Sequence, residues 1–280
     1  MTGDDLQDWR AAFAAHGVVR IPAAFSRAQV GAAQRLFDWS IANPGPYAGD
    51  VLAGAEGSFF QDHANPEALP HYRDFAMETG LAPLIAAVLG TRNLWLLYEQ
   101  VWRKEGRATR RTPWHQDLPY VPMAGHHMAT AWISLDPVAE AASLEFVRGS
   151  HQGPLYNPTT FSASDERAAM FADGIWPSLP EIEANRNDFP IVRWAVEPGD
   201  ILLFHPAMLH GGAPTAAGQR RRTISLRVFG DDVTCCPRPD QGIAEVDRLA
   251  ADEACGDPIR ILAGKPEGFP FRHPAFAKIV

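Results

Sequence analysis

The first ninety or so residues carry the hydrophobic spacing of helices. In residues 5–16 the apolar side chains recur every three or four positions, which predicts an amphipathic helix, and Gly17 follows as its end. Residues 18–21 predict a strand. Two further helices are expected over 26–41 and 72–89, the first starting at a serine N-cap and the second ending at a glycine.

Beyond about residue 93 the pattern changes to strand-like runs, with Gly, Pro and Asp between them. The predicted strands span 94–103, 128–135, 143–147, 191–196, 201–204 and 223–229. Helices followed by many antiparallel strands indicate a mainly β fold with flanking helices. We expect a double-stranded β-helix, the cupin-like jelly roll, buttressed by N-terminal helices.

The chain has 280 residues, 46% of them hydrophobic, which suits one domain with a large core. We expect a single domain over 1–280, with a helical buttress over about 1–92, a jelly-roll core over about 93–232 and a C-terminal extension over about 233–280. Residues 153–190 form a long aromatic-containing insert. Because long connections in compact domains commonly have a function, this insert is expected to act as a lid.

The chain is acidic, with a formal net charge of −8 and a pI near 5.7. Nucleic acids and anionic membranes attract basic surfaces, so the charge argues against both as partners. No apolar stretch approaches the length of a membrane-spanning helix, and the first residues are acidic where a signal peptide is basic. Three cysteines suggest no disulfide framework. We expect a cytoplasmic protein that acts on a small molecule, and the sequence leaves its oligomeric state open.

A run that reads Thr-Pro-Trp-His-Gln-Asp places an imidazole and a carboxylate two positions apart. On an extended strand, His115 and Asp117 share one face. A second imidazole, His210, follows the predicted strand 201–204, and His205 is an alternative to it. Two histidines and one carboxylate leave positions of an octahedral iron open, as in non-haem Fe(II) oxygenases. A buried His–Asp hydrogen bond without a metal is the other interpretation.

The segment after His210 starts as a turn-rich loop and then alternates. One face of the predicted strand carries Arg221, Thr223, Ser225 and Arg227. If this face lines the interior, the guanidinium of Arg221 needs an anion, and a dicarboxylate co-substrate would supply one through a bidentate pair.

Several motifs together carry a family resemblance. They are the runs Trp-Arg-Lys-Glu-Gly from Trp102, Trp-His-Gln-Asp from Trp114, Ala-Trp-Ile-Ser-Leu-Asp from Ala131 and Gly-Ser-His from Gly149. In order and spacing they resemble the phytanoyl-CoA dioxygenase family of Fe(II)/2-oxoglutarate oxygenases. The resemblance extends over most of the chain, from about residue 17 to 229.

The resemblance implies a role for each site residue. His115, Asp117 and His210 would hold Fe(II), and Arg221, eleven residues after His210, would bind the far carboxylate of 2-oxoglutarate. The other expected co-substrate contacts are Gln100, Lys104, Gln116, Trp132 and Thr223. Many relatives have a serine two residues after the distal histidine where this chain has Gly212, so fewer co-substrate contacts are expected here.

The resemblance also implies a reaction, in which O₂ and 2-oxoglutarate oxidise a C–H bond of a small organic substrate with release of succinate and CO₂. Halogenases that resemble this family replace the carboxylate ligand with a small residue, so Asp117 favours hydroxylation over halogenation. Two alternatives remain. A jelly-roll metalloenzyme that does not use 2-oxoglutarate, such as an isomerase or a cofactor-independent dioxygenase, would not need Arg221. A non-catalytic binding protein on this scaffold would more typically have lost a ligand.

Overall fold

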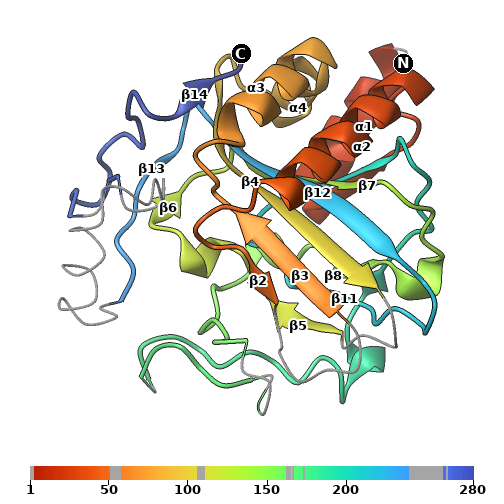
Figure 1. Cartoon of the computed structure of the whole chain (residues 1–280). Coiled ribbons are helices and arrows are strands. Elements are labelled where there is room, and N and C mark those ends of the chain that lie inside the picture. Colours follow the sequence, from red (N-terminus) through yellow and green to blue (C-terminus); the bar gives the residue numbers. More distant parts are fainter. Residues whose placement is uncertain are drawn as a thin grey trace.

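Two β-sheets face each other in the computed structural model, and helices cover the outer side of the larger sheet (Figure 1). This is the expected jelly roll with N-terminal helices. The structure describes residues 3–50, 58–105, 111–161, 165, 167–172, 174–239, 261–262 and 264–280.

The N-terminal helices within the described residues are α1 (Gly3–His16), α2 (Arg27–Ala42), α3 (Leu69–Glu78) and α4 (Leu81–Leu89). Ser26 caps α2 as predicted, because its hydroxyl accepts a hydrogen bond from the Gln29 amide at 3.3 Å and the Gln29 side chain accepts one from the Ser26 amide at 2.8 Å. The prediction of one helix over 72–89 is wrong. Gly80, with a left-handed φ of 78°, separates α3 from α4. None of the described helices is long and apolar enough to cross a membrane.

The larger sheet is antiparallel throughout its described strands. Its order is β1 (Val18–Ile21), β10 (Ile201–Phe204), β7 (Met128–Ser134), β12 (Arg221–Gly230), β4 (Leu94–Glu105), β3 (Ser58–His63) and β2 (Gly49–Asp50), with β14 (Ala277–Lys278) also paired to β4. The long strands β4, β7 and β12 therefore form its centre.

The smaller sheet supplies the opposite wall. Its order is β5 (Thr112–His115), β11 (His210–Gly212), β8 (Leu144–Val147) and β9 (Ile191–Val192). A separate pair joins β6 (Met123–Ala124) to β13 (Thr234–Cys235). The 3-10 helices are η1 (Leu118–Tyr120), η2 (Glu140–Ala142), η3 (Ser150–Gln152) and η4 (Arg186–Asp188).

Most of the predicted strands are confirmed. The exception is 191–196, which ends as a strand at Val192, while Val196 makes only an isolated bridge to Val138. The hydrophobic pattern did not predict β3 or the short strands β2, β6, β11, β13 and β14. A strand of two or three residues has too few positions for an alternation of apolar and polar side chains to be recognised.

Strand β12 shows how alternating side chains determine which residues face the space between the sheets. Ile224 and Leu226 are completely buried on the face that packs against the helices. Thr223 and Ser225 point the other way, into the space between the sheets. The polar face of a central strand is thereby held inside the barrel.

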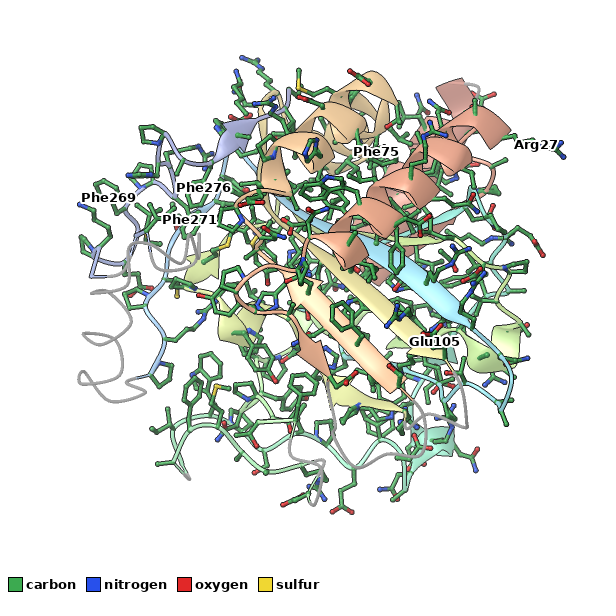
Figure 2. All side chains as sticks on the ribbon, in the orientation of Figure 1. Arg27, Phe75, Glu105, Phe269, Phe271 and Phe276 are labelled. Carbon is green, nitrogen blue, oxygen red and sulfur yellow. The ribbon has the colours of Figure 1, made fainter. Side chains whose placement is uncertain are left out.

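The described part of the C-terminal extension covers one end of the larger sheet. Phe271 and Phe276 each meet the Phe229 ring edge-on, with ring centroids 5.3 Å apart. Figure 2 labels Phe271 and Phe276 side by side, and their rings stack with centroids 5.2 Å apart. This contact completes the core where β12 ends.

Candidate metal centre and its cavity

The three expected metal ligands converge from two neighbouring strands. His115 ends β5 and His210 begins β11, and the two residues are direct partners across the ladder. Asp117 lies beyond the end of β5, where the backbone turns toward η1 with φ −75° and ψ −35°. The prediction that His115 and Asp117 share one extended strand is therefore wrong, and the turn brings the carboxylate back over the imidazole.

His210 follows β10 along the chain but lies in the other sheet. The chain leaves the larger sheet after β10 and crosses to the smaller sheet before His210, so this residue starts a new strand. His205 lies within that crossing and faces elsewhere. Its Nδ1 accepts a hydrogen bond from the Ala207 amide at 3.1 Å, and its ring packs near Phe13 and His151. His210 is consequently the imidazole beside His115.

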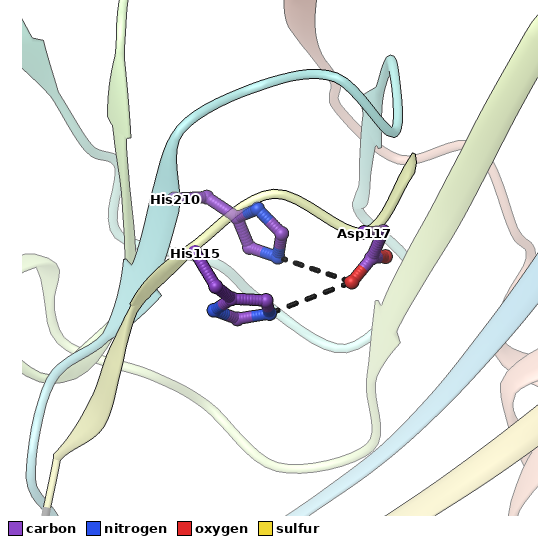
Figure 3. Close-up of side chains that lie close together, drawn as sticks. All are labelled: His115, Asp117 and His210. Atoms are coloured by element: carbon purple, nitrogen blue, oxygen red, sulfur yellow. Dashed lines mark ion pairs between the residues drawn. The ribbon is translucent and has the colours of Figure 1, made fainter. Parts of the chain in front are cut away.

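The ligand atoms have the separations that one ion requires. His115 Nε2 lies 3.4 Å and His210 Nε2 lies 3.9 Å from Asp117 Oδ1. Dashed lines mark these two ion pairs in Figure 3. One potential ligand atom from each residue lies within 4.8 Å of the others. Two nitrogens and one oxygen on a single side match the donor set of a non-haem iron site.

Backbone carbonyl groups orient both imidazoles. His115 Nδ1 lies 2.8 Å from the Pro113 carbonyl oxygen, and His210 Nδ1 lies 3.0 Å from that of Met208. A carbonyl can only accept, so Nδ1 carries the proton and the lone pair of Nε2 faces Asp117. Such fixed tautomers are typical of metal-binding histidines.

The electrostatics keep Asp117 and His210 in the protonation states of metal ligands. Burial alone would raise the pKa of Asp117, but Arg227 and the two imidazoles hold it well below its usual range. Burial, and next the neighbouring His115, lowers the pKa of His210 to about 4. The carboxylate is thus charged and His210 neutral at physiological pH, as metal ligands must be.

The triad opens onto a cavity of about 510 Å³ between the sheets. This volume lies within the range of small-molecule sites. Apolar walls come from Phe59, Met123, Met128, Phe161, Met170 and Phe204. The inward face of β12 supplies Arg221, Thr223, Ser225 and Arg227.

Arg221 occupies one end of this cavity. It is 6% exposed, and its guanidinium donates to the Ala142 carbonyl oxygen. No ion pair among the described residues includes Arg221, and burial lowers its pKa to about 10. A buried cation without a carboxylate partner favours binding of an anionic ligand.

Lys104 lies directly across the ladder from Arg221. Its Nζ is 3.3 Å from Thr112 Oγ1 and 4.0 Å from the centre of the Phe59 ring. Burial, followed by the charges of Arg221 and Arg111, lowers the pKa of Lys104 well below its usual value. Two basic side chains therefore lie at the same end of the cavity.

The structure places most of the other expected contacts on the cavity wall, namely Gln100, Lys104, Trp132 and Thr223. Gln116 is not among these wall residues. Its side-chain amide donates to the Ala207 carbonyl at 2.8 Å, and its Oε1 accepts from the Tyr156 amide at 2.9 Å. Gln116 thus fastens the start of the 153–190 insert.

Thr112 was not predicted as a site residue, although it lies beside Gly212. A side chain at position 212 would place its Cβ 3.0 Å from Thr112 Oγ1. The threonine hydroxyl therefore occupies space that a serine at 212 would need. Thr112 and Gly212 are partners in the ladder between β5 and β11, and this pairing is the feature that identifies Thr112 as a site residue.

Known proteins resemble this chain in sequence. The family model of phytanoyl-CoA dioxygenase (PhyH) matches residues 13–223. A probable phytanoyl-CoA dioxygenase of Caenorhabditis elegans is 26% identical over 180 residues, 62% of this chain and 54% of that protein. The peroxisomal phytanoyl-CoA dioxygenase of Rattus norvegicus is 28% identical over 129 residues, 45% of this chain and 36% of that protein. The chain thus spans about half of the first relative and about a third of the second.

Solved structures share the fold. The epimerase SnoN, crystallised with Fe3+, alpha ketoglutarate and nogalamycin RO, superposes with a TM-score of 0.72 over all of both chains at 19% identity. The carbocyclase SnoK from nogalamycin biosynthesis gives 0.69 at 17% identity, over 100% of this chain and 97% of that chain. EctD from S. alaskensis gives 0.62 at 17% identity, over 82% and 77%. Since the family model covers most of its length, the chain belongs to the phytanoyl-CoA dioxygenase family of iron- and 2-oxoglutarate-dependent oxygenases.

Proposed function

We propose that the protein is a non-haem Fe(II)- and 2-oxoglutarate-dependent dioxygenase that oxidises a C–H bond of a small organic substrate. One observation carries this proposal. The His115, Asp117 and His210 donors open into the same cavity as Arg221, a buried guanidinium without a carboxylate partner among the described residues. The far carboxylate of 2-oxoglutarate would supply the anion that this buried guanidinium lacks.

Each side chain then has a separate task. The two Nε2 atoms and Asp117 Oδ1 hold the ion, and Arg221 binds the far carboxylate of 2-oxoglutarate. When bound, the iron and its co-substrate supply the oxidising power, with O₂ consumed and succinate and CO₂ released. Thr223, two residues from Arg221 on the same face of β12, can donate a hydroxyl hydrogen bond to that co-substrate.

The 153–190 insert contributes to the exclusion of water. Phe161 packs edge-on against the His115 ring at 5.0 Å and stacks on Tyr120 at 5.8 Å. The Tyr120 hydroxyl donates to the Thr159 carbonyl at 2.6 Å, which ties the insert to η1. An apolar cover over the metal ligands protects reactive species from water, so we propose that this insert is a lid.

Asp117 supports a proposal about the reaction type. With iron bound, this carboxylate would take the coordination position that a halide would need, which supports hydroxylation over halogenation. SnoN and SnoK are named as an epimerase and a carbocyclase, so proteins of this fold carry out more than one type of reaction. For this chain we propose oxidation of a C–H bond. A cytoplasmic location remains a prediction from the sequence, whereas the rat relative is named as peroxisomal.

The experiment is anaerobic addition of Fe(II) and 2-oxoglutarate, which should produce the weak visible charge-transfer band of a keto acid chelated to iron. His115→Ala and Asp117→Ala should abolish this band, because each removes a ligand. His205→Ala is the matched control and should retain it. A band of full strength in both ligand variants would show that the ligands are wrong, and succinate release with a substrate panel then tests turnover.

A further inference from the structure

A group of polar side chains lies in the cavity beside Asp117, away from Arg221. We call it the polar corner and define it as His63, Tyr98, Thr130 and Arg227. Arg227 is at its centre, because β12 pairs it with Tyr98 on one side and Thr130 on the other. The guanidinium carbon lies 4.9 Å from the centre of the Tyr98 ring, and the His63 ring centre lies 6.1 Å from that ring.

The polar corner concentrates hydrogen-bonding groups that the protein itself does not satisfy. Among the described residues that line the cavity, buried polar atoms without a partner occur on three side chains. They are Nδ1 of His63, Oγ1 of Thr130, and Nε and Nη1 of Arg227. Buried polar atoms in native proteins nearly always have partners, so a cluster of exceptions in a cavity indicates a ligand.

Among the described residues Arg227 has one hydrogen bond to a protein group, and that bond orients the guanidinium. Its Nη2 donates to Asp117 Oδ2 at 3.3 Å, on the side of the carboxylate away from the imidazoles, which face Oδ1. This bond leaves Nε and Nη1 for another acceptor. Only 14% of the Arg227 side chain is exposed, so an acceptor there would be shielded from competing water.

The far carboxylate of the co-substrate, at Arg221, lies away from the polar corner. Arg227 and Arg221 are six residues apart on β12, so their Cα atoms lie about 20 Å apart at the usual rise of about 3.3 Å per residue. A five-carbon dicarboxylate with one end at Arg221 and the other at the metal ligands has both charged ends in use. The free donors of Arg227 therefore remain for the substrate.

The charge balance selects the class of substrate. The charges of Fe(II) and 2-oxoglutarate cancel. Asp117 is then the one carboxylate among the described cavity residues, against Arg221, Arg227 and the ionisable Lys104. At least one positive charge is left over, and a carboxylate, which accepts from several donors at once, would neutralise it.

We propose that the polar corner binds a carboxylate group of the substrate, so that the enzyme oxidises organic acids whose apolar part lies along the neighbouring methionines. Met123 and Met128 line the cavity and pack in the same cluster as Tyr98. This inference rests on the proposed function, because the co-substrate must occupy the Arg221 end.

The test is a binding screen that needs no turnover. The protein is loaded with Zn(II), which is redox-inert, and with 2-oxoglutarate. A panel of monocarboxylic acids, each paired with its own primary amide, is then measured by ligand-observed NMR and calorimetry. The wild type should bind its best acids at least tenfold more tightly than the matching amides. Arg227→Gln should remove this preference, Arg227→Lys should keep part of it, and the exposed Arg220→Gln should leave it unchanged.

Because Arg227 also contacts Asp117, the zinc content of every variant is measured. Thr130→Val leaves the Arg227–Asp117 bond in place and should weaken acid binding at least threefold at full zinc occupancy. The proposal is overturned if no acid outperforms its amide in the wild type, if Arg227→Gln keeps the preference, or if it weakens 2-oxoglutarate binding as Arg221→Ala does. A normal charge-transfer band without acid preference would reject this inference alone, whereas a missing band would reject the proposed function.

Discussion

Replacement of Arg221 tests how the co-substrate is held. Arg221 is 6% exposed, and its hydrogen bond to the Ala142 carbonyl already fixes the orientation of the guanidinium. Arg221→Ala would leave the far carboxylate of 2-oxoglutarate buried without its partner. Loss of one member of a buried charge pair costs roughly 2–5 kcal/mol. At about 1.4 kcal/mol per factor of ten, the dissociation constant should rise between about 30-fold and a few thousand-fold.

Lys104 should keep the loss of 2-oxoglutarate affinity in Arg221→Ala near the lower end of that range. It lies across the ladder from Arg221, whose charge is the second cause, after burial, of its lowered pKa. Without Arg221, Lys104 is protonated more easily and can attract the same carboxylate. The combined change Arg221→Ala with Lys104→Met should therefore weaken binding more than Arg221→Ala alone. Arg221→Lys should fall between the wild type and Arg221→Ala, because a point charge replaces a planar fork.

The assay is calorimetric titration of 2-oxoglutarate into protein loaded with Co(II) in the absence of O₂. Arg222→Ala is the matched control, since Arg222 points to the opposite face of β12 and pairs with Asp136 at 2.8 Å. It should change the dissociation constant less than twofold, and the Co(II) affinity should survive in every variant. Wild-type binding by Arg221→Ala, or a larger loss in Arg222→Ala, would refute the reasoning.

Three further experiments test the fold and the proposed lid. Burial raises the pKa of Glu99 from 4.5 to about 8, so the folded state retains a proton that the unfolded chain releases. The free energy of unfolding should then fall as the pH rises from about 4.5 to 8. Glu99→Gln should reduce this dependence on pH, as measured by urea titrations at several pH values. An unchanged pH dependence in Glu99→Gln would contradict the raised pKa of Glu99. Gly17→Ala should lower the free energy of unfolding by roughly 2–5 kcal/mol, because Gly17 has a φ of +76° and an added Cβ would overlap neighbouring side chains. Gly49→Ala is the control and should have little effect, since no atom lies within 4 Å of the added Cβ. Limited proteolysis should cut first within 153–190 and slow down with metal, co-substrate and substrate present, and equal cleavage in both states would argue against a lid.

The faces of the long strands could be predicted from the sequence. Alternation has a period of two wherever a strand forms, so the inward positions of Arg221, Thr223 and Arg227 follow from local geometry alone. The same holds for the N-cap at Ser26, because a capping box depends on residues three positions apart. The two-residue spacing of His115 and Asp117 also indicated the metal site from local sequence alone. The backbone between them, however, turns and does not continue the strand that the motif suggested.

Pairing between distant segments was decided only by the tertiary structure. The ladder that sets His210 beside His115, and Gly212 beside Thr112, joins strands that are too short to show a pattern. The bond from Arg227 to Asp117 spans 110 residues, and no local spacing encodes it. Contacts of this kind depend on which strands become neighbours and in which register, and that is decided by burial of the whole core. The sequence therefore determined which residues carry the chemistry, and the packing of the two sheets determined which of them meet.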